Sequence, residues 1–491
     1  MSPHPYLHLR VSGKRLFRCL LLAAILPLLF PPPALGQVYE QVYGLIDIRS
    51  TYSDGDYSID QLAAMAKELG FGALFVTDHD RMVIAYGFPP FRHLLRKKEE
   101  LSAIHVHGAQ AYLQAIRNAQ ARHPEVILIP GVETTPFYYW TGSPLGNDLT
   151  AHDHEKRLLV IGMNQAEDYR NMPILHNRKA LRWDNLQPPV YLFLGAALLA
   201  IPLICWSGPL RLLGILVLPL SLLLMFNSDP LRTSPFNAYS GDQGPAPYQL
   251  VIDYVNDHGG MTFWNYPETA SGIRSLGPIR VSTKPYPGML QSTRGYTGFA
   301  ALYGDNITLT EPGSLWDMTL LDYCRGYRKR PVWGIATADY HGEGKDGAKL
   351  GNFPTVFLVR ENTGPALLKA MQAGRMYACQ TTYPARPRLE VFSVSSPDGA
   401  VQAVSGEDIR FAGTPRIQIA LSVSGTEMTG PVEIRLIRGG TLISAFEERL
   451  PARIEYEDKD LKIKEKTYYR IDMQGGAGKI VSNPIFVTRE G

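Results

Sequence analysis

The sequence has little cysteine and little net charge. Of its four cysteines, Cys19 and Cys205 fall in strongly apolar segments, which leaves Cys324 and Cys379 for the folded domains. At most one ordinary disulfide can therefore form within those domains. The formal net charge of the 491 residues is only +3, so nothing in the composition indicates nucleic acid as a partner. Cys-x-x-Cys, P-loop and nucleotide-binding glycine motifs are also absent, which argues against the redox and nucleotide-binding classes that use them.

Polar residues follow two predicted strands near the amino terminus. Residues 45–48 form a short apolar run, 53–55 form a Ser-Asp-Gly turn, 59–69 repeat apolar residues at helical spacing, and 73–76 form a second buried strand. The polar residues at the two strand ends are Asp47, Arg49, Asp78 and His79. In a parallel α/β sheet or barrel such residues share one rim, and such rims hold active sites.

This stretch resembles the opening of the PHP (polymerase and histidinol phosphatase) family, where a His-x-His pair precedes Ser-Asp-Gly and a Thr-Asp-His follows the second strand. Three later segments resemble further family motifs: Gly131-Val132-Glu133, the closing Asp339-Tyr340-His341, and residues 259–267, in which Tyr266 replaces a histidine. The resemblance extends from residue 44 to residue 377 in the family's order. It implies a PHP-like distorted (β/α)7 barrel.

The resemblance also implies a metal site, whose two halves differ here. Asp54, His79 and His341 are retained, and two imidazoles with a carboxylate suit zinc, manganese or iron. In the other half, Asp47 and Arg49 stand where the family has its His-x-His pair, and Arg157 aligns with a further histidine of the family. Arginine cannot ligate a cation, so we expect fewer than three ions. The candidate metal ligands are Asp47, Asp54, His79, Glu133, Asp339 and His341, and the candidate catalytic residues are Arg49, Arg157 and Tyr266.

Several interpretations of the altered site remain open. In the first, Arg49 and Arg157 replace the lost metals as fixed cations and pair with the carboxylates of Asp47, Glu133 and Asp339. In the second, Asp54, His79 and His341 hold one metal that activates water, while the arginines bind an anionic substrate such as a phosphate ester. A site made only of those three carboxylates is a third alternative. His152 or His154 could supply a ligand if Arg157 is not the aligned residue.

Two parts of the sequence are apolar enough to meet a membrane. Residues 1–36 carry basic residues, an apolar run and a small-residue end, as a secretory signal peptide does, with an uncleaved anchor as the alternative. Residues 188–227 hold two uncharged apolar runs around a turn with Arg211, which predicts a transmembrane helical hairpin. Two buried core helices are the soluble alternative. We therefore expect a protein of the cell envelope, with its domains on the extracytoplasmic side.

The predicted fold class is α/β with a second, all-β domain. Residues 37–187 and 228–383 are expected to form the two parts of the barrel around the hairpin, and 384–491 a β-sandwich, because short alternating segments there are divided by glycine, proline and aspartate. The resemblance implies a metal-dependent hydrolase, a phosphoesterase, acting on a small-molecule or envelope-derived anionic substrate beside membrane lipid. The alternative is a catalytically inactive PHP-like binding or scaffold protein.

Overall fold

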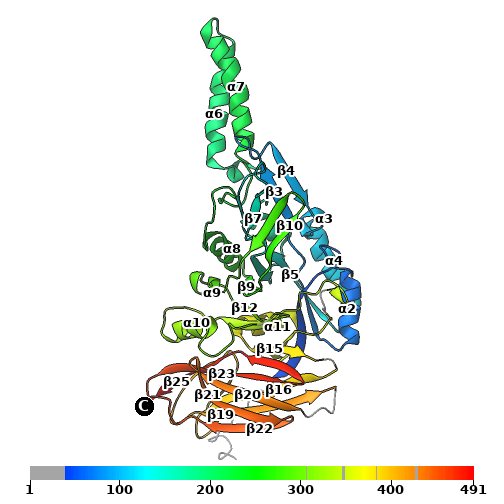
Figure 1. Ribbon diagram of the computed structural model, residues 1–491, viewed down its shortest axis with the longest axis vertical. Coiled ribbons are helices and arrows are strands. Elements are labelled where there is room, and N and C mark those ends of the chain that lie inside the picture. The colour runs from blue at the N-terminus through cyan, green and yellow to red at the C-terminus, as the bar shows by residue number, and fades with distance from the viewer. Residues whose placement is uncertain (1–38, 306, 346–348, 383, 426–429, 491) are drawn as a thin grey trace, which may run out of the picture.

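The computed structural model describes residues 39–305, 307–345, 349–382, 384–425 and 430–490 (Figure 1). The predicted signal peptide therefore lies outside the described residues. The chain folds into a mixed α/β part, a projecting pair of helices, and a large sheet-rich C-terminal part. Within the described chain, Cys205, Cys324 and Cys379 are all free thiols.

Seven strands of the α/β part pair in one continuous series. In order of pairing they are β1 (Glu40–Ile48), β2 (Ala73–Val76), β5 (Ile127–Thr134), β8 (Arg157–Ile161), β9 (Met261–Asn265), β12 (Gly298–Leu302) and β13 (Trp333–Ala336). The chain after β13 returns to β1, where Arg49 N–H donates to the Tyr340 carbonyl at 2.9 Å and Tyr340 N–H donates to the Asp47 carbonyl at 3.1 Å. The series is thereby linked back to its first strand.

One strand of this series departs from the expected parallel arrangement. β1, β2 and β5 pair in parallel, as do β9, β12 and β13, but β8 is antiparallel to both β5 and β9. The first residue of β8 therefore lies at the rim where its neighbours end. This orientation brings Arg157 to the same rim as the residues that follow β1, β2 and β5.

Helices and short strands surround the series. The helices are α2 (Ile59–Glu68), α3 (Ile104–His107), α4 (Ala109–Arg122), α5 (Ala166–Asn171), α8 (Ala246–Asp257), α9 (Met289–Ser292), α10 (Leu315–Cys324) and α11 (Gly364–Ala373), with a 3-10 turn at Trp183–Asn185. Their buried faces join the strands in one hydrophobic core that includes Leu62, Tyr112, Tyr248, Trp316 and Leu367. Ser58 begins α2 with a capping box to Gln61, which satisfies backbone donors at the helix start. The minor strands are β3 (Val83–Gly87), β4 (Arg96–Glu100), β6 (Tyr139–Thr141), β7 (Thr150–His152), β10 (Gly272–Leu276) and β11 (Ile279–Thr283).

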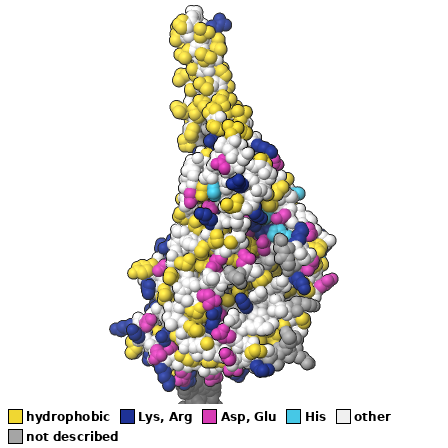
Figure 2. Space-filling model, in the orientation of Figure 1, with side chains coloured by type: hydrophobic (Ala, Val, Ile, Leu, Met, Phe, Trp, Pro, Cys, Tyr) yellow, Lys and Arg dark blue, Asp and Glu magenta, His cyan; other side chains and the backbone are white. Residues whose placement is uncertain are grey.

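Two apolar helices project from the α/β part at the end opposite the C-terminal sheets (Figure 1). They are α6 (Pro188–Ile204) and α7 (Pro209–Asn227), and they pack against each other. A Cβ added at Gly214 would lie 2.8 Å from the Ala200 carbonyl oxygen, so glycine allows the two backbones to approach closely. Most of the outer surface of the pair is exposed apolar side chain (Figure 2). In the described chain, α7 is long and apolar enough to cross a membrane, whereas α6 is shorter.

The C-terminal part shares a sheet with the α/β part. β1 pairs with β14 (Pro354–Val359), β14 with β15 (Met376–Thr381), and β15 with β24 (Gly478–Ser482), giving a 15-stranded sheet. It continues through β23 (Lys466–Gly475), β20 (Pro431–Arg438) and β21 (Thr441–Arg449). β25 (Ile485–Glu490) also pairs with β23, and β18 (Asp408–Ala412) pairs with β25. A separate sheet holds β17 (Gln402–Val404), β16 (Arg386–Ser395), β19 (Arg416–Ser424) and β22 (Ala452–Glu457). Buried residues of both sheets form a second hydrophobic cluster.

Candidate metal and anion site

The candidate residues gather at the rim of the seven-strand series. Asp47 and Arg49 lie at the end of β1, Asp78 and His79 after β2, and Glu133 near the end of β5. Arg157 begins β8, Asn265 and Tyr266 lie at the end of β9, and Asp339 and His341 follow β13. The structure thus brings together every site residue that the sequence singled out, including Asp54 from the turn after β1.

Three of these residues have an unusual backbone. Asp47 (φ 69°), Tyr266 (φ 46°) and Asp339 (φ 46°) adopt the left-handed conformation, which non-glycine residues rarely occupy. The pairing of β1 with β2 is also irregular between Leu45 and Ile48, at the position of Asp47. Such strained residues cluster at functional sites, where the surrounding structure holds them in place. Here the conformation directs three side chains toward one centre.

That centre is the guanidinium of Arg49, which is fully buried. Its Nη1 lies 2.7 Å from Asp47 Oδ1, and its Nη2 lies 2.8 Å from Glu133 Oε2 and 3.6 Å from Asp339 Oδ1. The Asp47 and Glu133 side chains are likewise fully buried, so the charges are sealed from solvent. Burial by itself would lower the pKa of Arg49, but the three carboxylates raise it well above its ordinary value. Arg49 is therefore a permanent cation inside the pocket.

A second layer of donors completes the pairing of the two buried carboxylates. Asn265 Nδ2 donates to Asp47 Oδ2 at 2.8 Å and to Glu133 Oε1 at 2.6 Å, and the Tyr266 hydroxyl donates to Asp47. Arg157 Nη1 reaches Glu133 Oε2 at 2.9 Å. Burial opposes ionisation of Glu133, but Arg157 and Arg49 lower its pKa to about 2. Burial and the nearby carboxylates raise the pKa of Tyr266, so it remains a neutral donor.

Asp54, His79 and His341 form a separate cluster beside this ion-paired centre. One ligand atom from each lies within 4.8 Å of the others. Nε2 of His79 and Nε2 of His341 both face Asp54 Oδ2, at 3.4 and 3.3 Å. The side chains of Asp54 and His341 are 37% and 21% exposed, so a solute can reach this cluster from outside.

The other ring nitrogen of each histidine is held by a neighbour. His79 Nδ1 lies 3.2 Å from Glu133 Oε2, and His341 Nδ1 lies 2.8 Å from the Asp339 carbonyl oxygen. Protonation at Nδ1 leaves each Nε2 with a free lone pair, which is how metal-binding histidines are oriented in proteins. His79 Nε2 is buried and makes no hydrogen bond of good geometry with any described residue. Two imidazole nitrogens and one carboxylate therefore fit a divalent metal ion.

The charges around this cluster favour neutral His79 and ionised Asp54. Burial lowers the pKa of His79, and the nearby Arg49 lowers it further. Burial would raise the pKa of Asp54, but the neighbouring imidazoles of His341 and His79, together with the charge of Arg49, hold it well below its usual range. Burial opposes protonation of His341, but the Asp54 carboxylate raises the pKa of the imidazole above its ordinary value.

Three residues that support the site were not singled out from the sequence as site residues. Besides Asn265, these are Ser50 and Ser53, whose hydroxyls donate to Asp78 at 2.7 and 2.6 Å. Asp78 thereby ties the turn that carries Asp54 to the end of β2. The signal available in the sequence was position alone, because each residue adjoins a predicted strand end or the Ser-Asp-Gly turn.

The two alternative histidines make their contacts outside the metal cluster. His152 Nε2 interacts with Thr141 Oγ1 at 2.7 Å, and its ring stacks on Tyr139. His154 contacts the Tyr138 ring and lies 3.4 Å from the Val83 carbonyl oxygen. Burial lowers the pKa of His154 to about 4. Arg157, rather than either histidine, occupies the position beside Glu133.

Comparison with known proteins places the first part of the chain in a family. No curated protein sequence shows significant similarity to the chain. A solved two-domain protein from Bacteroides vulgatus, described as containing a predicted PHP-like metal-dependent phosphoesterase, is 11% identical with a TM-score of 0.36, covering 89% of this chain and 92% of its own. An amidohydrolase from Chromobacterium violaceum is 15% identical with a TM-score of 0.29, covering 68% and 96%. The family model of the PHP domain matches residues 47–186. The chain contains a PHP domain.

Proposed function

We propose that the protein is a divalent-metal-dependent phosphoester hydrolase that uses one ion, held by Asp54, His79 and His341. The observation that supports this most directly is the convergence of two Nε2 atoms and one carboxylate at a partly exposed position, with both Nδ1 atoms already engaged. The PHP-domain match adds the expectation of metal-dependent hydrolysis. Zinc, manganese and iron all suit this donor set.

The residues around the ion have separate roles in this proposal. A bound divalent ion supplies water of lowered pKa and a Lewis acid for a phosphoryl oxygen. Arg157 is 21% exposed, so its guanidinium can contact an anionic substrate and offset the negative charge that develops during hydrolysis. Arg49 is fully buried and acts as a positioning residue: it fixes Glu133, which in turn orients His79. Tyr266 holds Asp47 and acts in the same indirect way.

Asp47, Glu133 and Asp339 are not needed as ligands in this proposal. The Arg49 guanidinium contacts all three, so it supplies the positive charge that a second ion would bring. A metal bound to these carboxylates would have to displace the Arg49 side chain, which is buried and ion-paired with them. We therefore infer a single ion.

The same ion pairing supports a second candidate function, a catalytically inactive binding or scaffold protein of the envelope. A pocket whose carboxylates are neutralised by Arg49 and Arg157 keeps its charge balance without any ion. Removing His79 would then change little beyond stability.

We further propose that α6 and α7 tether the protein to a membrane as a helical hairpin. The pair carries exposed leucines along its outer surface, and contiguous apolar surface of this size is rare on proteins that stay in water. α7 has the length and composition of a membrane span, and α6 is a little shorter than the ~20 residues that cross a bilayer comfortably. The PHP domain, arranged as a distorted barrel, would then sit at the membrane surface.

Metal analysis tests the proposed hydrolase. Plasma mass spectrometry on the detergent-purified full chain should find about one ion per chain after repletion with manganese, zinc and iron. His79→Ala and His341→Ala should each lose that ion together with hydrolysis of a chromogenic phosphoester, whereas His258→Ala, on a helix end away from the cluster, should keep both. Wild type that binds no ion and hydrolyses no phosphoester would refute the hydrolase and leave the scaffold function.

A further inference from the structure

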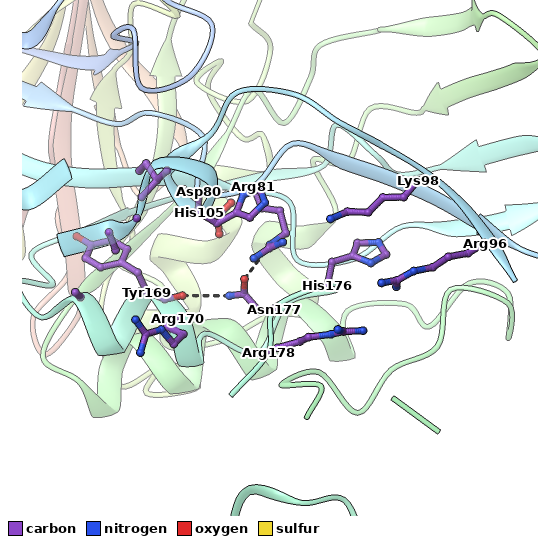
Figure 3. A pocket seen from close by; sticks show the side chains of 14 residues that line it. Asp80, Arg81, Arg96, Lys98, His105, Tyr169, Arg170, His176, Asn177 and Arg178 are labelled. Atoms are coloured by element: carbon purple, nitrogen blue, oxygen red, sulfur yellow. Dashed lines mark hydrogen bonds between the residues drawn. The ribbon is translucent and has the colours of Figure 1, made fainter. Parts of the chain in front are cut away.

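A second cavity, of about 330 Å³, lies between β4, the starts of α3 and α4, and the segment that runs from α5 to residue 178 (Figure 3). Five cationic side chains line it, whereas Asp80 is the one carboxylate among its lining residues. The cations are Arg81, Arg96, Lys98, Arg170 and Arg178. The volume is at the lower end of the range for small-molecule sites. None of Asp54, His79 and His341 lines this cavity, although Arg81 and His176 also line a smaller cavity beside His79 and Arg157.

The charge of this basic pocket is only partly neutralised. Four of the five cations have carboxylate partners outside the cavity lining: Lys98 and Arg81 pair with Glu100, Arg170 with Glu167, and Arg178 with Asp229. Arg81 Nε donates to Asn177 Oδ1 at 2.9 Å, which fixes the guanidinium against the wall of the pocket (Figure 3). Arg96 pairs with Gly87 through the backbone of β4, but its side chain makes no hydrogen bond or ion pair with any residue in the described ranges. Burial lowers the pKa of His176 to about 3, so this lining histidine is neutral and adds no charge.

The basic pocket is attached directly to the base of the helical hairpin. Asp229, just after α7, lies 2.9 Å from Arg178 Nη2, and Asn227 Oδ1 accepts from the His93 N–H, in the turn between β3 and β4, at 3.1 Å. Lys179 N–H donates to the Leu231 carbonyl oxygen at 2.8 Å. The elements that carry the cations of the pocket are thus braced against the end of α7 and the residues that follow it.

Exposed apolar residues surround the same region. Phe88, Leu94 and Leu95 are exposed in the turn between β3 and β4, and Leu181 and Trp183 are exposed just before α6. Aromatic and aliphatic side chains at this level of a membrane protein contact the headgroup region, and tryptophan is enriched there. We call these five exposed residues the apolar collar. If α6 and α7 enter the bilayer, the apolar collar lies at the bilayer surface, and the basic pocket lies next to it.

We propose that the basic pocket binds the phosphate group of an anionic membrane lipid. Guanidinium groups bind phosphate oxygens through charge-assisted, often bidentate, hydrogen bonds, and Arg96 is free to make them. Basic pockets beside membrane helices suit lipid headgroups, because surface charge and apolar contacts act together there. The inference rests on the proposed membrane attachment, but not on metal binding or hydrolysis.

Strand β4 provides a matched pair of variants. Side chains alternate between the two faces of a strand, so Arg96 and Lys98 line the pocket while Lys97 lies between them and outside it. The Lys97 side chain is largely exposed and pairs with the exposed side chain of Glu99. Arg96→Gln and Lys97→Gln therefore remove the same charge from adjacent residues, and neither breaks a buried contact.

Native mass spectrometry on the full chain in detergent, without added metal and with a chelator present, measures the binding. Phosphatidic acid should bind more tightly than phosphatidylcholine. Arg96→Gln should weaken phosphatidic acid binding about tenfold, as expected for one hydrogen bond to a charged group, whereas Lys97→Gln should stay within about twofold of wild type. Equal loss in the two variants would overturn the proposal in favour of non-specific charge attraction.

A second arm distinguishes the source of the phosphate. Inorganic phosphate and glycerol 3-phosphate should compete only weakly, because they lack the acyl chains that meet the apolar collar. If either compound displaces the lipid at an equal concentration, the pocket binds a soluble phosphate compound and the lipid proposal is overturned. Because the assay contains chelator, loss of lipid binding cannot be confused with failure of the proposed hydrolase.

Discussion

Replacing Arg49 by methionine should destabilise the PHP domain strongly. The side chain and its two nearest carboxylates are fully buried, so the substitution leaves Asp47 and Glu133 in the interior without their principal counter-charge. Removing one partner from a buried ion pair costs about 3–5 kcal/mol. Asn265 and Arg157 remain as partners of the two carboxylates, so we expect the low end, about 3 kcal/mol.

A melting experiment measures this loss. At roughly 2–4 °C per kcal/mol for a domain of this size, Arg49→Met in chelator should melt roughly 6–12 °C below wild type. Arg416→Met is the control, because Arg416 forms a surface pair with Glu457 at 3.1 Å in which both side chains are about half exposed. That pair should contribute about 0–1 kcal/mol.

The same variant tests whether the guanidinium stands in for an ion. With Arg49 gone, the carboxylates of Asp47, Glu133 and Asp339 form an anionic cavity, and added manganese should restore part of the lost melting temperature. Manganese should raise the melting temperature of the wild type less, because Arg49 still occupies the space between these carboxylates. An Arg49→Met protein that melts within about 2 °C of wild type in chelator would refute the account of the ion-paired centre.

Three further outcomes follow from the geometry. Metal uptake should weaken as the pH falls, because the Asp54 carboxylate outweighs burial and raises the pKa of His341 above its ordinary value, and the imidazole must lose its proton to bind an ion. Uptake that is flat from pH 8 to pH 5.5 would contradict this. Asn265→Ala should lower the free energy of unfolding by about 1–3 kcal/mol in urea titration, because two buried carboxylates each lose a donor; an unchanged midpoint would remove Asn265 from the site. Alkaline carbonate should leave the wild type in the membrane pellet, and release of the wild type into the supernatant would refute the hairpin anchor. Replacing residues 188–227 with a short Gly-Ser linker should release a folded protein, because the two ends to be joined are already close: Gln187 N–H donates to the Pro230 carbonyl at 3.1 Å.

The sequence predicted the PHP domain because its motif residues sit at strand ends, and strand ends meet at one rim. Asp54, His79 and His341 could be selected by residue type, since few residues ligate metals. Asn265 could not be selected in this way, because asparagine at a strand end is common and its double contact depends on the left-handed backbone of Asp47. The antiparallel course of β8 was also hidden, since a buried strand has the same apolar pattern in either direction.

The assembly of the basic pocket from several segments, and the shared sheet, could not be predicted from the sequence for a different reason. The cations come from three segments of the chain, one with Arg81, one with Arg96, and one with Arg170 and Arg178, and each segment alone resembles an ordinary solvated surface. The pairing of β15 with β24 joins strands about a hundred residues apart, and no local pattern encodes such a register.

The pairing of β15 with β24 also sets an order for synthesis. β15 ends at Thr381, and its edge stays unpaired until the strand from Gly478 to Ser482 has been made, almost at the end of the chain. Contacts between such distant segments form slowly, and an open strand edge invites pairing with other chains. A nascent protein thus carries its complete set of site residues while this edge is still bare. A protein shortened near its C terminus should therefore aggregate rather than yield a smaller folded protein.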